Sequence, residues 1–385
     1  MPAGASYAAA IRRHGPGVME ERHGMRQTGR MPILPSFRFP TVAARSRGRR
    51  FAVFLLLATL ASPALAAPLP EAARDSIAEQ AGTLPRSHSL LVAVDGDTVI
   101  DEGFRGHETD ETANIKSLSK TLISALVGAA IDRGVIESVD QPVVELLGDR
   151  VPTDIDPRVS DITVGNLLSM QAGLERTSGG NYGAWVASSN WVADALERPF
   201  VAEPGGRMLY STGNSHLLSA ALTEATGRST LALARDWLGD PLGISIPPWT
   251  RDPQGIYFGG NEMGLTPQAL LRFGEMIRQH GTPDDRTVLS TDWIERSWQP
   301  RTRSFFNGDD YGYGWFITRI AGQPVYYGWG YGGQLLYVMP SRAMTVVMTS
   351  DPTPPSSGSD YLDDVEALVA ELIEATNPPN QETST

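Results

Sequence analysis

Residues 114–121 read Asn-Ile-Lys-Ser-Leu-Ser-Lys-Thr and open the segment that most constrains the fold of this chain. From Ser117 to about Arg133 apolar side chains recur three and four residues apart, and the pattern closes at Gly134. The recurring residues are Leu118, Leu122, Ala125, Leu126 and Ala129. This spacing predicts a buried helix with a polar first turn. Ser117 and Lys120 are three residues apart, so such a helix places their side chains on one face.

This Ser-x-x-Lys pair is the candidate catalytic centre. If Ser117 lies in the first turn, its backbone N–H is unpaired and could stabilise an oxyanion at the positive end of the helix dipole. Lys120 would then lie among Leu122, Ile123 and neighbouring helices, where desolvation lowers its pKa towards that of a usable base. The alternative interpretation is structural, with Ser117 as a helix cap and Lys120 on the surface.

The composition supports a special role for lysine. The chain of 385 residues holds 32 Lys and Arg, and only Lys116 and Lys120 are lysines. A site that keeps lysine where arginine is otherwise used can need a cation that loses its proton. The chain has no cysteine, which excludes disulfides, thiolate nucleophiles and cysteine-ligated metal sites.

Charge is distributed unevenly along the chain. Residues 1–66 carry ten Arg against two Glu, a net charge of +8, and the remainder carries −20. An acidic body disfavours nucleic-acid binding and repels strongly anionic substrates. Four arginines precede the apolar run Phe51–Leu60, and residues 64–66 are the small Ala-Leu-Ala that a signal peptidase accepts.

This pattern predicts a leader with a signal peptide over 1–66, cleaved near Ala66 or Ala67. We therefore expect an exported protein, periplasmic or secreted, that keeps no stable membrane anchor after cleavage. The alternative is that the apolar run stays as an N-terminal membrane anchor, although ten residues are too short to span a bilayer.

Strand-like runs occur near both ends of residues 67–385, and helical patterns lie between them. The predicted strands are Leu90–Val94, Thr98–Ile100, Tyr313–Ile320, Pro324–Tyr327, Leu335–Met339 and Thr345–Met348. Further predicted helices are Val164–Met170, Leu217–Ala225, Thr230–Trp237, Pro267–Gln279 and Asp360–Ala375. We expect an α/β (α+β) domain over 67–385. Its antiparallel sheet, from about 67–116 and 301–376, is flanked by helices, and an all-helical region of about 117–300 is inserted.

Other nucleophile and metal systems lack a local motif in this chain. It has no Gly-x-Ser-x-Gly elbow, and the histidines after the leader show no metal-ligand spacing. These histidines are His88, His107, His216 and His280. Gly328–Gly333 lacks the Lys-Ser/Thr ending of a phosphate-binding loop. A Ser-His-Asp triad assembled from distant residues stays open. We expect no metal and no cofactor.

The order of motifs resembles the penicillin-recognising serine hydrolases, in particular the class C β-lactamase-like branch. The matching segments are Asn114–Thr121, Ile162–Leu174, Pro204-Gly205 through Tyr210-Ser211, Pro241–Ile244 and Gly259-Gly260. The residues Tyr-Ser-x-Gly-Asn at 210–214 and Gly-x-Gly-Gly-Gln at 330–334 also resemble esterases and 6-aminohexanoate-dimer hydrolases of this branch. The resemblance implies a β-lactamase/transpeptidase-like fold for residues 67–385.

The resemblance also implies roles for individual residues. Ser117 would be the nucleophile of an acyl-transfer reaction, with Lys120 and Tyr210 as general base and acid. The third family motif falls on Gly328-Trp329-Gly330. The oxyanion would then be held by the backbone N–H groups of Ser117 and Tyr331, or of Gln334 if the register is shifted.

Two departures from the family pattern bear on the substrate. Thr212 stands where relatives often have the Asn of a Tyr-x-Asn motif, and Asn214 is a candidate replacement. The third motif has no cation, whereas β-lactamases and D-Ala-D-Ala peptidases use one to hold a substrate carboxylate. The candidate substrate-binding residues are Trp329, Gly330, Gly332 and Asn214, with Tyr331 and Trp185 as further aromatic contacts.

The missing cation favours a carboxylesterase or amidase acting on a small-molecule ester or amide. A D-Ala-D-Ala carboxypeptidase or a β-lactamase is the enzymatic alternative. A non-catalytic penicillin-recognising binding or sensor protein, or a scaffold of the cell envelope, would keep the fold without turnover.

Overall fold

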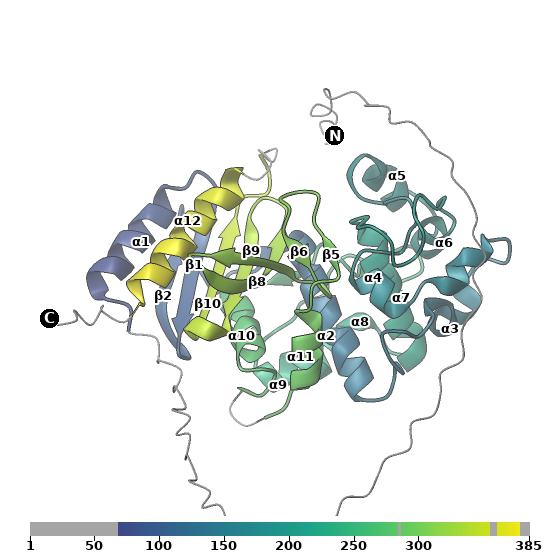
Figure 1. Ribbon diagram of the computed structural model, residues 1–385, viewed down its shortest axis with the longest axis horizontal. Coiled ribbons are helices and arrows are strands. Elements are labelled where there is room, and N and C mark those ends of the chain that lie inside the picture. Colours follow the sequence, from purple (N-terminus) through teal and green to yellow (C-terminus); the bar gives the residue numbers. More distant parts are fainter. Residues whose placement is uncertain (1–67, 284–285, 355–359, 378–385) are drawn as a thin grey trace, which may run out of the picture. The chain divides into compact units, whose positions relative to one another are not determined.

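Eight strands form one antiparallel sheet in the spatial order β2-β1-β10-β9-β8-β7-β6-β5 (Figure 1). The computed structural model describes residues 68–283, 286–354 and 360–377, and the leader expected over 1–66 lies outside them. The strands are β1 (Ser87–Val94), β2 (Asp97–Gly103), β5 (Thr302–Arg303), β6 (Asp310–Tyr311), β7 (Phe316–Ile320), β8 (Gln323–Gly330), β9 (Gln334–Met339) and β10 (Met344–Ser350). Because β1 pairs with β10, the sheet joins the two ends of the described chain.

Side chains of the central strands alternate between two hydrophobic cores. In β9, Leu336 and Val338 enter one core, and Leu335, Tyr337 and Met339 enter the other. The second core lies beneath α1 (Glu71–Thr83) and α12 (Asp360–Ala375), which pack side by side (Figure 1). Since successive strand side chains point to opposite faces, a strand covered on both faces is apolar throughout. The predicted antiparallel sheet flanked by helices is confirmed.

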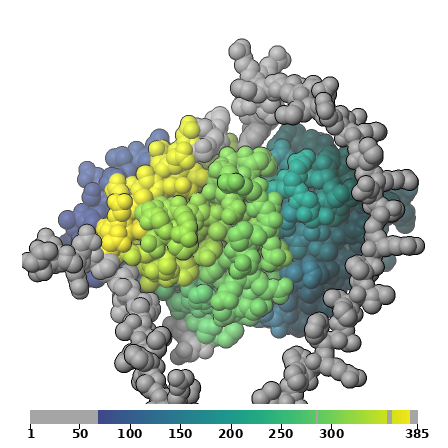
Figure 2. Space-filling view, viewed as in Figure 1, coloured from purple at the N-terminus to yellow at the C-terminus, as the bar shows by residue number. Residues whose placement is uncertain are grey.

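A helical region packs beside the C-terminal strands, shown as teal against green in Figure 2. The remaining helices are α2 (Ser119–Asp132), α3 (Val143–Leu147), α4 (Val164–Leu168), α5 (Tyr182–Val186), α6 (Trp191–Leu196), α7 (Thr212–Thr226), α8 (Thr230–Ala234), α9 (Asp240–Leu242), α10 (Pro267–Arg278) and α11 (Thr291–Ser297). Helix α10 lies on β1, β9 and β10. Within the described residues, no helix is long and apolar enough to cross a membrane.

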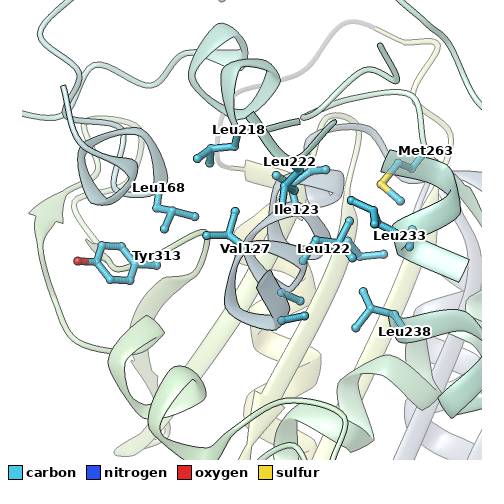
Figure 3. Packing of buried hydrophobic residues seen from close by; sticks show 14 of the residues in the cluster. Leu122, Ile123, Val127, Leu168, Leu218, Leu222, Leu233, Leu238, Met263 and Tyr313 are labelled. Carbon is cyan, nitrogen blue, oxygen red and sulfur yellow. The ribbon is translucent and has the colours of Figure 1, made fainter. Parts of the chain in front are cut away.

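Helix α2 passes through the middle of the first core. Its residues from Ser119 to Ala130 are all buried. Figure 3 shows side chains of this core, including Leu122 and Val127 of α2 and Leu218 and Leu222 of α7. Because α2 is enclosed on every side, the surrounding core holds the residues at its N-terminus in place.

Local features differ from the sequence prediction. The helix expected from Ser117 begins as a 3-10 turn at Lys116–Leu118 and becomes α-helical at Ser119. Strand β8 continues past the predicted end at Tyr327 to Gly330, because glycines that sequence patterns treat as breaks are retained in this strand for close approach.

A second small sheet was not predicted. Strand β3 (Ala113–Asn114) pairs with β4 (Gly264–Leu265), a segment for which only helices and turns were expected. Two-residue strands carry too little alternation to be recognised from sequence. This pairing brings residues 260–265 beside the segment that leads into Ser117.

Candidate active site

Ser117 and Lys120 face each other where the 3-10 turn meets α2. Ser117 is half-buried, whereas Lys120 is only 3% exposed. Residues three apart eclipse each other in a 3-10 turn, and Lys120 Nζ lies 3.0 Å from Ser117 Oγ. Lys120 Nζ also donates to the Gly260 carbonyl at 2.7 Å and lies 3.3 Å from Thr212 Oγ1. The arrangement combines an accessible hydroxyl with a buried amine.

Burial controls the protonation of Lys120. Desolvation lowers the pKa of its amine from 10.5 to about 7, because a low-dielectric environment disfavours the charged form. A large fraction of Lys120 is therefore neutral near pH 7 and can accept a proton from the Ser117 hydroxyl.

Tyr210 reaches the same hydroxyl from a distant part of the chain. Its side chain is hydrogen-bonded to Ser117, and Lys120 Nζ lies 5.0 Å from the centre of its ring. Burial raises the pKa of Tyr210 far above its ordinary value, outweighing the opposite effect of the Ser117 hydrogen bond. The phenol therefore stays protonated at neutral pH, and Lys120 is the group that changes charge.

Thr177 and Ser178 hold the segment that follows Tyr210. The Thr177 N–H donates to Ser211 Oγ at 3.0 Å, and Ser178 Oγ accepts from the Thr212 N–H at 2.8 Å. The hydroxyls of Ser178 and Thr212 lie 3.0 Å apart. Because Thr212 also contacts Lys120, this network connects the Tyr210 motif to the buried amine.

The sequence analysis did not identify Thr212 or Ser178 as site residues. Thr212 occupies the position of the missing motif Asn and contacts Lys120, whereas Asn214 forms no hydrogen bond with Lys120 or Ser117 within the described residues. The side-chain amide nitrogen of Asn214 is buried and, within the described part of the chain, has no hydrogen-bond partner. The only sequence signal for Thr212 was its position two residues after Tyr210.

Glycines allow strand β8 to lie directly against the Ser117 segment. A Cβ at Gly330 would overlap the carbonyl oxygen of Ile115, and one at Gly328 would overlap the Leu118 side chain. Only glycine permits this approach of two backbones. The last residues of β8, which carry the third motif, therefore lie beside the segment that contains Ser117.

Gly332 and Gln334 contact residues at and after the end of β10. Gly332 lies against Pro352, whose Cα would be 2.5 Å from an added Cβ. The Gln334 side chain is buried and hydrogen-bonds the backbone of Ser350 through both amide atoms, which ties β9 to β10. Tyr331 lies in the turn that connects β8 to β9. Gly332 therefore lies against the chain that follows β10, and its contact with substrate stays a prediction.

An aromatic cluster lies beside Tyr210. The ring centre of Phe306 is 5.3 Å from that of Tyr210 and 6.1 Å from that of Trp329, with both pairs edge-to-face. The Phe305 ring lies tilted against Phe306 with ring centres 4.1 Å apart, and these two rings are 54% and 45% exposed. Trp185, by contrast, is fully buried among Trp191 and Phe258, so it lines no binding surface.

The sequence analysis missed Phe305 and Phe306 because isolated aromatics in a turn carry no periodic signal. Their turn is ordered by Asp309, whose carboxylate accepts hydrogen bonds from Tyr327 at 2.6 Å and Asn307 at 2.8 Å. Phe306, which contacts the buried Tyr210, and its exposed neighbour Phe305 form a continuous apolar surface, which is more informative than single exposed apolar residues.

Where the structure describes the chain, no histidine forms a hydrogen bond or ion pair with Ser117, Lys120 or Tyr210. His216 Nε2 lies 3.1 Å from the Asp252 carboxylate, and both side chains are fully buried. His216 Nδ1 accepts the Gly259 N–H at 3.4 Å, which assigns the ring proton to Nε2. In residues 68–283, 286–354 and 360–377, no group of three or more His, Asp or Glu side chains could hold a metal ion.

A family model described as Beta-lactamase matches residues 85–371, which is most of the chain. The chain belongs to the beta-lactamase family. The predicted membership in the serine hydrolase superfamily is thereby confirmed, and Ser117, Lys120 and Tyr210 all lie within the matched residues.

Solved structures share the fold of this beta-lactamase family member. A protein of Bacillus anthracis assigned as a 6-aminohexanoate-dimer hydrolase superposes with a TM-score of 0.63 at 18% identity, over 75% of this chain and 79% of its own. A penicillin-binding protein homologue of Caulobacter crescentus superposes with a TM-score of 0.66 at 17% identity, over 80% of this chain and 98% of its own. At these identities the likeness establishes the fold.

A curated relative matches a shorter stretch. The "Probable fimbrial assembly protein FimD, serogroup H1" of Dichelobacter nodosus is 32% identical over 144 residues, which is 36% of this chain and 36% of that protein. The matching stretch therefore spans about a third of the relative.

Burial of Lys120 should make the stability of this family member depend on pH. Between pH 7 and 10.5 the unfolded state binds a proton that the folded state lacks, so the free energy of unfolding rises with pH. From pH 7 to 9 the wild type should gain about 2 kcal/mol relative to Lys120→Met, which lacks the ionisable amine. Urea unfolding at both pH values measures this difference. Parallel pH responses of the two proteins would mean that folded Lys120 keeps an ordinary pKa.

Proposed function

We propose that this beta-lactamase family member hydrolyses an ester or amide bond through an acyl-enzyme on Ser117. The observation that carries the proposal is the contact of 3.0 Å between Ser117 Oγ and the buried Lys120 amine, whose pKa is lowered to about 7. A neutral amine beside a hydroxyl provides the general base that nucleophilic serine chemistry requires.

In the proposed mechanism, Ser117 Oγ attacks the substrate carbonyl and its proton passes to the Lys120 amine. The backbone N–H groups of Ser117 and Tyr331 stabilise the oxyanion. Tyr210 donates its phenolic proton to the leaving alcohol or amine, and the Lys120 ammonium reprotonates Tyr210. Water then attacks the acyl-enzyme with the same proton route in reverse, which releases the acid and restores Ser117.

The surroundings of the site favour an apolar substrate. Gly328-Trp329-Gly330 provides no cation for a substrate carboxylate, and the aromatic cluster of Phe305, Phe306 and Trp329 lies beside Tyr210. Tyr210 protonates the leaving group in this mechanism, so an apolar part of the substrate can lie on these rings. This argues for esterase or amidase activity over β-lactamase or D-Ala-D-Ala carboxypeptidase activity.

Parallel assays test the proposal. The purified wild type is given p-nitrophenyl butyrate, nitrocefin and a D-Ala-D-Ala peptide, with Ser117→Ala as the control. Ester hydrolysis by the wild type alone supports the proposal. Preferential turnover of nitrocefin or the peptide would replace it with the corresponding family activity, and acylation without product release would favour a sensor.

Removing an exposed ring should weaken binding of long apolar substrates. Phe306→Ala is expected to raise KM for hexyl butyrate by about 3- to 10-fold and to change KM for methyl butyrate little, because only the longer leaving alcohol reaches the ring. Val201→Ala is the matched control, since Val201 is a similarly exposed apolar residue at 46%. Equal effects on both esters would show that Phe306 does not contact the substrate.

We also propose that the chain is exported through its leader, which supplies the basic and apolar segments of a signal peptide. Sequencing the N-terminus of the protein recovered from the periplasm or medium tests this. A mature chain that begins near Ala67 is expected, and one that begins upstream of Phe51 would contradict it.

A further inference from the structure

Lys116, the second lysine of the chain, forms a half-buried ion pair next to the nucleophile. Its Nζ lies 3.1 Å from Glu262 Oε1, with side chains 23% and 29% exposed. The other carboxylate oxygen, Oε2, accepts a hydrogen bond from the Asn114 amide at 2.6 Å. Asn114 in turn accepts the backbone N–H of Lys116 at 3.0 Å. These three side chains form a closed network around the residue that precedes Ser117.

Both members of the ion pair have left-handed backbone. The φ angles are +51° at Lys116 and +64° at Glu262. Residues other than Gly, Asn and Asp rarely adopt the left-handed region. Such a conformation persists where surrounding contacts impose it. Since Lys116 directly precedes Ser117, the backbone angle of Lys116 sets the direction in which the Ser117 side chain points. The ion pair supplies contacts that can hold this angle.

The segment that carries Glu262 also holds the catalytic amine. The carbonyl of Gly260, two residues before Glu262, accepts a hydrogen bond from Lys120 Nζ at 2.7 Å. The carbonyl of Met263, one residue after Glu262, accepts a hydrogen bond from the Ile115 N–H at 3.0 Å. Residues 260–263, which we call the brace loop, therefore contact the chain on both sides of Ser117.

The geometry favours lysine over arginine at position 116. Each carboxylate oxygen of Glu262 has a different donor, Lys116 on Oε1 and Asn114 on Oε2. An ammonium is a point charge that satisfies one oxygen, whereas the planar fork of arginine tends to engage both. Arginine at 116 would compete with Asn114 for Oε2.

We propose that Lys116 and Glu262 are positioning residues for Ser117 and Lys120, an inference that rests on the hydrolysis proposed above. Their ion pair holds the left-handed turn before Ser117, and it anchors the brace loop so that the Gly260 carbonyl stays on the Lys120 amine. Neither side chain touches the reacting atoms. They act on kcat through the geometry of the catalytic pair and have little effect on substrate binding.

The kinetic test uses Glu262→Gln and Lys116→Met with p-nitrophenyl butyrate. Each should lower kcat by about 10- to 100-fold and change KM by less than about threefold, as expected when the geometry of a catalytic pair is lost. Lys116→Arg should fall between the wild type and Lys116→Met, because it keeps the charge but disturbs Asn114. Glu224→Gln is the matched control, since Glu224 pairs with Arg150 on the surface at 2.6 Å. It should match the wild type.

A second test needs no substrate. Lysine labelled with ¹³C at Cε gives signals from only two residues, and Lys116→Arg identifies the signal of Lys120. Its chemical shift and titration midpoint should change in Glu262→Gln and stay unchanged in Glu224→Gln. If the wild type shows no hydrolysis, this measurement still decides whether the brace loop controls Lys120.

Glu262→Asn removes the ion pair with the least disturbance of the backbone. Asparagine accepts left-handed backbone, but its shorter, uncharged side chain cannot form the ion pair. It should keep the wild-type unfolding midpoint within a few degrees and still lose kcat. Wild-type kcat in Glu262→Asn and Lys116→Met, or a Lys120 signal that Glu262→Gln leaves unchanged, would overturn the inference.

Discussion

Ser117→Ala should lower kcat/KM for p-nitrophenyl butyrate by about 10⁴- to 10⁶-fold, as removal of the nucleophile does in other serine hydrolases. The neighbouring Ser119 and Thr212 hydroxyls are engaged in other contacts. The Ser119 hydroxyl is turned away and donates to the Lys116 carbonyl at 2.6 Å. Thr212 Oγ1 contacts the Lys120 amine at 3.3 Å, but it is also 3.0 Å from Ser178 Oγ in the supporting network.

Covalent labelling separates loss of the nucleophile from loss of the fold. A serine-reactive fluorophosphonate should add one mass increment to the wild type and none to Ser117→Ala. Ser160→Ala is the control, because Ser160 is exposed and its hydroxyl donates to the Pro157 carbonyl. Ester hydrolysis at the wild-type rate in Ser117→Ala would remove the mechanism, and a labelled Ser117→Ala would place the nucleophile elsewhere.

The pH dependence of the wild type should follow the ionisation of Lys120. Below its pKa of about 7 the amine is protonated and cannot accept the Ser117 proton, so kcat/KM should fall tenfold per pH unit. Above that pH the rate should level off. Tyr210 cannot produce this limb, because burial raises its pKa and keeps the phenol neutral throughout the range.

Lys120→Arg isolates the requirement for a neutral amine. Arginine keeps the positive charge but does not lose its proton, so kcat/KM should fall by about 10²- to 10⁴-fold at pH 8, and the limb near pH 7 should disappear. The full profile from pH 5 to 10 measures both effects. An acid limb near pH 7 that persists in Lys120→Arg at a comparable rate would mean that another group is the base.

The local features of the site could be read from the sequence. Ser117 and Lys120 are three residues apart, and helical spacing alone predicts that they meet, as the distance of 3.0 Å between their side chains shows. The rarity of lysine marked the same segment, and both lysines of the chain do flank the candidate nucleophile. The apolar runs of β1, β9 and β10 predicted strands, because two-sided burial leaves an uninterrupted hydrophobic signal.

Other features depend on residues far apart in the chain. Thr212 and the brace loop contact Lys120 across 92 and 140 residues. Asn214 was a candidate for the position that Thr212 takes, because counting along the chain cannot tell which face of α7 meets Lys120. The contact of Gly332 with Pro352 also joins distant residues, because it depends on the turn after β8 meeting the chain that follows β10.

The sequence by itself therefore determined the family, the sheet with its helical insertion, and the pairing of one serine with one lysine, since each is encoded in motifs or in periodicity over a few residues. Only the tertiary structure decided that Lys120 is desolvated, that Tyr210 stays neutral beside it, and that Glu262 braces the turn before Ser117. Desolvation and left-handed backbone are imposed by surrounding segments of the fold, and no short stretch of sequence specifies those neighbours.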